Sequence, residues 1–199
     1  MRRVLSIFLL FGILGVTAWT LLQWNRVTNA AADPWRPIPA RAAIIVEIPD
    51  AIVGWDRFTH TSQFWSGLER IPAMRAIGRS MAQAMERAEN DAAFRGTMED
   101  MTILLAVMRT GGDQADVLLT CAPRSVDGAP ARTFAELLRI DEAAIGTLLS
   151  GSAVQCRPDT ALPPLAVTVH DGVWIIASST AMMDEALLQE KTTRAVESD

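Results

Sequence analysis

Several residues on which enzymes commonly depend are scarce in this chain of 199 residues. Lys191 is the only lysine, so a Schiff-base or serine–lysine mechanism would have to use a side chain in a polar C-terminal stretch. The two histidines, His60 and His170, are far apart in the sequence, and neither belongs to an HExxH pattern. We therefore interpret both as turn or surface histidines rather than as metal ligands.

The common catalytic and cofactor-binding motifs are also absent. The chain contains no GxSxG nucleophile elbow, no GxGxxG turn and no phosphate-binding loop. The adjacent acids Glu99 and Asp100, like Asp141 and Glu142, lie at predicted element boundaries, where helix caps and charged ends are expected. The sequence therefore predicts no catalytic residue, no metal ligand and no cofactor.

Only two cysteines are present, Cys121 and Cys156, and they form no CxxC pattern. Each lies at the end of a strand-like run. An oxidising compartment permits a disulfide between them, and the alternative is two separate buried thiols that pack as small apolar groups.

Positive charge is in short supply, and tyrosine is absent. The formal net charge is -5. Arg2 and Arg3 precede an apolar segment, so the rest of the chain is more acidic than the total indicates. This balance argues against nucleic acid as a partner and against a basic patch that binds anionic lipid headgroups.

The most distinctive feature is an apolar segment near the N-terminus. The 21 residues from Val4 to Trp24 contain no charged side chain. As an α-helix they would span about 31 Å, the thickness of a bilayer hydrocarbon core. Arg2 and Arg3 before the segment predict a cytoplasmic N-terminus, with the bulk of the chain on the periplasmic side of the inner (cytoplasmic) membrane. We expect a single-pass membrane anchor.

A cleaved signal peptide is the alternative interpretation of this segment. Ala30, Ala31 and Ala32 resemble the small residues of a cleavage site. However, the apolar run is longer than a typical signal core of about 7–15 residues, and it contains Trp19 and Trp24. These features favour a retained anchor.

Composition divides the chain into four parts. Residues 1–24 form the predicted anchor, and residues 25–39 form a Pro/Ala linker, in which Pro34, Pro37 and Pro39 indicate an extended stalk. Residues 40–190 form one exported domain, large enough for its own core. Residues 191–199 are predicted to be a frayed polar tail.

Hydrophobic periodicity predicts an α+β fold within the exported domain. Asp171-Gly172 between alternating apolar residues predicts a hairpin, so we expect an antiparallel sheet with helices packed on one face. The predicted strands cover residues 42–48, 101–109, 116–122, 151–157, 165–170 and 173–178. The predicted helices cover residues 51–59, a stretch beginning at residue 61 or 62, then residues 72–92, 131–139, 142–150 and 181–190.

A methionine stripe on the helix that begins at Pro72 admits two interpretations. Methionine side chains are adaptable, and methionine-rich faces bind varied apolar partners. The simpler interpretation is that an amphipathic helix buries its stripe against the sheet. The candidate apolar docking face consists of Trp65, Met74, Ile77, Met81 and Met85.

Residues 38–79 follow a recognisable order: a Pro-Ala entry into a strand, a Trp-containing helix, an FWxxL segment and a helix started by proline. The features that carry this order are Pro39-Ala40, residues 43–48, Trp55, Phe64-Trp65-Leu68 and Pro72, together with the strands and helix of residues 165–188. In this pattern the chain resembles the opening of a bacterial family of membrane-anchored envelope proteins of unknown function. The resemblance implies an exported, anchored domain with no established activity, and a chain that is a truncated member of a longer family.

These observations favour a non-enzymatic interaction or scaffold module of the bacterial envelope, with a protein partner in the envelope. Two alternatives remain. One is an accessory of envelope transport or assembly that binds apolar client segments. The other is an envelope hydrolase with a non-standard site, which would need a cleft with converging carboxylates.

Overall fold

A computed structural model describes most of the chain after Ala31, with short gaps. The anchor predicted from Val4 to Trp24 lies outside the described residues, as does the first part of the predicted linker. The described ranges are residues 32–99, 101–111, 114–122, 132, 135–158 and 160–197. The helices are α2 (Ala51–Thr61), α3 (Gln63–Leu68), α4 (Pro72–Asn90), α5 (Ala92–Met98), α7 (Glu142–Leu149) and α8 (Thr180–Glu197), and the strands are β1 (Ile44–Ile48), β2 (Ile103–Gly111), β3 (Gln114–Cys121), β4 (Val154–Cys156), β5 (Leu165–His170) and β6 (Val173–Ala177).

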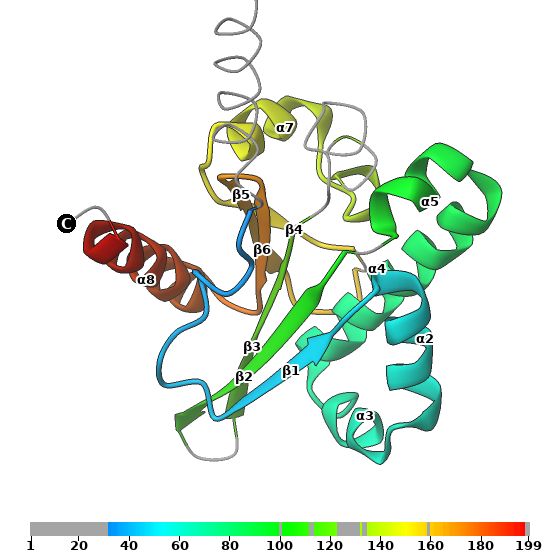
Figure 1. The fold of residues 1–199 in the computed structure, drawn as a ribbon, viewed down its shortest axis with the longest axis horizontal. Coiled ribbons are helices and arrows are strands. Elements are labelled where there is room, and N and C mark those ends of the chain that lie inside the picture. Colours follow the sequence, from blue (N-terminus) through cyan, green and yellow to red (C-terminus); the bar gives the residue numbers. More distant parts are fainter. Residues whose placement is uncertain are drawn as a thin grey trace, which may run out of the picture. The chain divides into compact units, whose positions relative to one another are not determined.

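The strands form one six-stranded antiparallel sheet in the order β1-β2-β3-β6-β5-β4 (Figure 1). The β2–β3 and β5–β6 pairs are hairpins, as their turn sequences predict. In the second hairpin, Asp171 and Gly172 both have positive φ, at 46° and 79°. A type I′ turn requires this conformation at both positions, which explains the Asp-Gly pair. The α+β prediction is confirmed.

Local capping chemistry sets where several helices begin. The Asp50 carboxylate accepts hydrogen bonds from the backbone N–H groups of Ile52 and Val53, at 3.1 and 3.2 Å. Ser62 accepts from the Phe64 N–H at the start of α3, and Pro72 occupies the first turn of α4, where a missing N–H costs nothing. These starts agree with the sequence prediction.

One helix was missed. The predicted helix from residue 72 ends two residues early, at Asn90, and a separate helix, α5, covers Ala92–Met98. Asp91 explains the break, because its carboxylate caps α5 by accepting from the N–H groups of Ala93 and Phe94, both at 3.1 Å.

The larger core lies on one face of the sheet, beneath α2, α3, α4, α5 and α7. Alternate residues of the central strands point into it, among them Leu105 and Leu119, whose exposed fractions are 0% and 1%. These two residues face each other across the β2–β3 pair. Trp174 of β6 joins the same core.

The prediction that helices cover only one face is wrong, because α8 packs on the other face (Figure 1). The intervening strand residues, such as Leu104, Leu118 and Ile175, are fully buried on that second face. The stripe that α8 turns toward the sheet includes Met182 and Ala186, also buried. In a sheet buried on both faces, a strand needs apolar residues at successive positions rather than only at alternate ones. β2 has them in its ILLAVM run.

The end of the predicted linker is part of the domain rather than an extended stalk. The compact unit begins at Asp33. Pro37, Ile38 and Pro39 are buried, and the Thr120 hydroxyl of β3 donates a hydrogen bond to the Pro34 carbonyl at 2.7 Å. The proline rings that suggested a stiff spacer instead supply compact turns and apolar surface on the α8 side of the sheet.

The polar tail prediction is also corrected, because α8 continues to Glu197 and includes most of residues 191–199. Polar residues do not end a helix when its earlier turns are held by tertiary packing. Among the described residues, no helix is both long enough and apolar enough to cross a membrane.

Candidate functional site

The structure divides the candidate docking face between the core and a groove. Met74, Ile77 and Met81 have exposed fractions of 0%, 2% and 8%, and they pack against the sheet. These three cannot form a free docking surface, because the amphipathic helix buries its stripe as the simpler interpretation predicts. Trp65 and Met85 lie at the edge of this core, where they also line an open groove.

We call this groove, formed by residues of α2, α3 and α4, the helical groove. Its volume is about 1070 Å³. Its apolar surface comes from Trp55, Trp65, Met85 and Ala82, and its polar residues come from all three helices. A groove of this size is large enough for a peptide segment and has no counterpart in the sequence prediction, because it is formed by the angle between helices.

An aromatic cluster gives the groove a rigid wall. Trp55 and Trp65 line the groove and meet edge to face with ring centroids 5.4 Å apart. Phe58 lies outside the lining and supports Trp65 from behind, with ring centroids 5.6 Å apart. Gly78 of α4 allows the Trp65 ring to approach, because a Cβ atom at Gly78 would lie 3.1 Å from that ring. The wall is therefore set by the fit between α3 and α4.

The charge of the helical groove is predominantly negative. The lining residues include four carboxylates, Asp56, Glu69, Glu86 and Glu89, against two guanidinium groups. Asp56 lies 3.1 Å from His60 Nδ1 in an exposed pair. Exposed charges of this kind contribute little to stability, but together they set which sign of ligand is favoured.

The two cysteines are not joined by a disulfide. Both are buried and free. Cys121 ends β3 and Cys156 ends β4, and β6 and β5 lie between these strands. Three strand spacings amount to about 14 Å, well beyond the roughly 4.4–6.8 Å between Cα atoms that a disulfide requires. Burial raises the pKa of each thiol to about 12, so both behave as apolar side chains.

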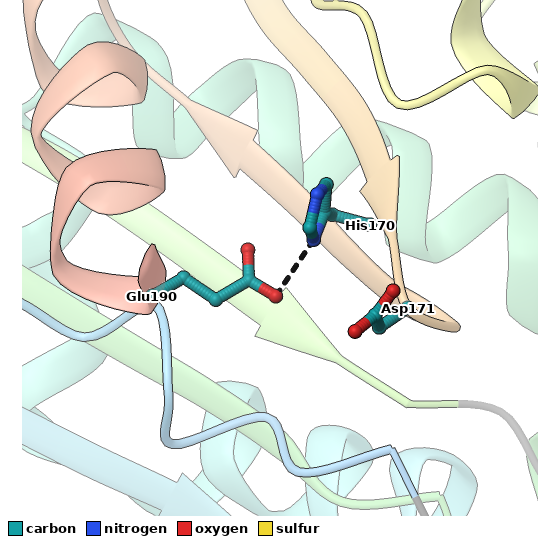
Figure 2. Close-up of side chains that lie close together, drawn as sticks. All are labelled: His170, Asp171 and Glu190. Carbon is teal, nitrogen blue, oxygen red and sulfur yellow. Dashed lines mark hydrogen bonds and ion pairs between the residues drawn. The ribbon is translucent and has the colours of Figure 1, made fainter. Parts of the chain in front are cut away.

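A second candidate site brings together His170, Asp171 and Glu190 on the α8 side of the sheet (Figure 2). His170 is the last residue of β5, Asp171 opens the hairpin turn, and Glu190 comes from α8. His170 Nδ1 lies 2.8 Å from Glu190 Oε1. One ligand atom from each of the three side chains lies within 4.8 Å of the other two.

His170 ends β5 directly before the turn, and its side chain is half-buried, with 28% of its surface exposed. Its carboxylate partner, Glu190, is 2% exposed. His60 does lie at the surface, with a side chain 76% exposed. The overlooked signal is the position of Glu190, four residues after the buried Ala186 and eight after the buried Met182 on the same helix stripe. A carboxylate on a buried stripe requires a polar partner.

Comparisons of the chain with protein-family models, with curated proteins and with solved structures found no match in any of the three.

Proposed function

We propose that this chain is a membrane-anchored, extracytoplasmic interaction module without enzymatic activity, and that the helical groove is its binding surface. The observation that carries the proposal is the combination of size, aromatic wall and charge in that groove. The uncharged segment from Val4 to Trp24 supports the anchor, and Arg2 and Arg3 support an outward orientation in the bacterial envelope.

The occupant that fits best is a basic amphipathic helix of a protein partner. A helix is about 10 Å across, so about 1070 Å³ would engulf roughly nine residues, or hold roughly 18 residues sunk to half their depth. An apolar stripe on such a helix would pack on Met85 and Ala82, the more exposed apolar residues of the groove, and lysine or arginine at its flanks would face Glu69 and Glu86. This is the helix-in-groove mode of peptide recognition.

The experiment measures peptide binding by the full chain in nanodiscs of zwitterionic lipid, with empty nanodiscs subtracted. The probe is a labelled 18-residue helical peptide with leucine on one face and lysine on the other, followed by fluorescence anisotropy. Two comparison peptides replace every lysine by glutamate or by glutamine. We expect the lysine peptide to bind at least tenfold more tightly than the glutamate peptide, which corresponds to about 1.4 kcal/mol.

A matched pair of variants locates the binding. Ala82 lines the helical groove and Gln83 does not, although both side chains are exposed on α4. Ala82→Arg places bulk and positive charge in the groove and should weaken binding at least tenfold, whereas Gln83→Arg should change it less than twofold. Equal loss in both variants would contradict the groove as the binding surface. Equal binding of the glutamine and lysine peptides would instead favour a module that takes apolar client segments.

A further inference from the structure

The cluster of His170, Asp171 and Glu190 lies on the α8 face of the sheet, whereas the helical groove is formed by helices on the other face. The cluster and the groove are therefore separate regions of the domain. Three side chains whose oxygen and nitrogen atoms approach so closely can serve either as an ion pair or as ligands of a metal ion. The burial of Glu190 and the separations between the ligand atoms bear on which role the cluster has.

Glu190 is the residue that most needs an explanation. Its side chain is 2% exposed and sits on an otherwise apolar helix stripe. Burying a carboxylate is costly unless charge and hydrogen bonds compensate it. His170 Nδ1, 2.8 Å from Glu190 Oε1, supplies part of that compensation. A divalent cation bound between these two side chains would add to it, because it brings two positive charges to the same position.

The observed distances are close to those that a bound metal needs. Two ligand atoms each about 2.1 Å from a metal lie about 3.0 Å apart at an octahedral angle and about 3.4 Å apart at a tetrahedral angle. The His170–Glu190 separation of 2.8 Å would have to widen by only a few tenths of an ångström. Asp171, within 4.8 Å, would approach through rotation of an exposed side chain in a turn.

A further polar atom lies on the same face of β5. Thr168 is fully buried two residues before His170, which is about 7 Å along the strand. Among the atoms that the structure describes, none forms a hydrogen bond with its hydroxyl oxygen. A buried hydroxyl without a protein partner is a position where an ordered water or another ligand is expected. The environment along this strand is thus more polar than a closed apolar core would be.

We propose that His170, Asp171 and Glu190 form a binding site for a divalent metal ion of the zinc or manganese class, with water completing the coordination. One imidazole with two carboxylates is a ligand set that these ions accept. Magnesium and calcium prefer oxygen ligands throughout, so the imidazole disfavours them. Because His170 belongs to β5 and Glu190 to α8, the ion clamps the helix to the sheet and stabilises the domain.

The test uses the full chain in zwitterionic nanodiscs, with any purification tag removed and metal stripped by a chelator. Titration calorimetry with Zn²⁺ and with Mn²⁺ should show one equivalent bound per chain, by at least one of the two ions. At a hundredfold excess of the binding ion over Kd, the unfolding temperature should rise by about 5–10 °C. The visible absorption of Co²⁺ should change in position and intensity relative to the aqueous ion when the protein is added, which reports entry of protein ligands into its coordination shell.

Three substitutions and one control assign the ligands. Glu190→Gln and His170→Gln should each weaken metal binding at least tenfold. Asp171→Asn should weaken it several-fold while preserving the turn, since Asn-Gly suits a type I′ hairpin as well as Asp-Gly does. Asp171→Asn therefore remains informative if either buried variant fails to fold. His60→Ala, at the exposed pair with Asp56, should leave binding unchanged.

Two outcomes would overturn the proposal. The first is the absence of stoichiometric binding by both ions, or weak binding of several equivalents that Asp171→Asn leaves unchanged. The second is binding that His60→Ala removes and His170→Gln does not. Either result would leave the hydrogen-bonded pair of His170 and Glu190 as a contact that holds α8 against β5.

Discussion

Replacement of Met81 by alanine tests whether the methionine stripe is core or docking surface. Met81 is 8% exposed and lies on α4 beside a partly enclosed apolar cavity of about 30 Å³, which is also lined by Leu119 and Trp174. The substitution removes three heavy atoms, or roughly 70 Å³, from this position. The new void would join the existing one, and we expect the enlarged cavity to remain because the surrounding side chains move only partly into it.

Two terms give the magnitude. The lost transfer free energy of the buried atoms is about 1.5 kcal/mol, and the cavity term at about 24 cal/mol per Å³ adds about 1.7 kcal/mol. We therefore expect Met81→Ala to lower the free energy of unfolding by about 3 kcal/mol. For a domain of this size that corresponds to a fall in unfolding temperature of about 6–12 °C.

The assay follows intrinsic tryptophan fluorescence of the full chain during heating, with two companion variants. Met81→Leu nearly preserves the side-chain volume and should cost less than about 1.5 kcal/mol. Met85→Ala should cost less than Met81→Ala, because Met85 is only half-buried. A fall of less than 2 °C for Met81→Ala, together with lost peptide binding, would refute the core assignment and restore the docking face.

Three further predictions concern other parts of the chain. The native thiols of Cys121 and Cys156 should resist alkylation at pH 8 and react fully after unfolding. Their folded pKa of about 12 exceeds the ordinary value of about 9, so the free energy of unfolding should fall as pH rises from about 9 to about 12. A variant with alanine at both positions should lose less stability over the same pH range. Gly54→Ala should lower the free energy of unfolding by more than about 2 kcal/mol, since its Cβ would lie 2.2 Å from the backbone carbonyl oxygen of Pro49. As the control, Gly67→Ala places its Cβ in open space on a helix and should raise the free energy of unfolding by up to about 1 kcal/mol, measured by thermal unfolding. The chain should stay in the membrane pellet after alkaline carbonate extraction, and its release would contradict an anchor formed by the segment from Val4 to Trp24.

Local chemistry explains the parts of the fold that the sequence predicts well. The Asp171-Gly172 turn, the Asp50 cap and the first-turn Pro72 each act within a few residues, so their effect does not depend on what packs around them. Element types and approximate bounds follow from such signals. The helical groove does not, because it depends on how Trp65 fits against Gly78 of another helix.

The covering of the second face could have been anticipated from strand composition. In β2, both parities of the ILLAVM run are apolar, which is typical of a strand buried on both sides. Helices on one face alone would leave Leu104 and Met108 exposed to water. A second layer was therefore required, and the elements that supply it, α8 and the turns after Asp33, were those predicted to be a shorter helix and a stalk.

The position of the cysteines depends on strand order, which is a non-local property. β3 and β4 follow one another in the chain as consecutive strands, and Cys121 and Cys156 end them, an order that suggests neighbouring strands in the sheet. The β5–β6 hairpin is inserted between them because β6 pairs with the free edge of β3. The strand lengths fit this arrangement: β2 and β3, with nine and eight residues, lie inside the sheet, while β4, with three, lies at an edge, where short strands are favoured. The prediction of a longer strand over residues 151–157 concealed this signal, because only residues 154–156 of that run pair with β5.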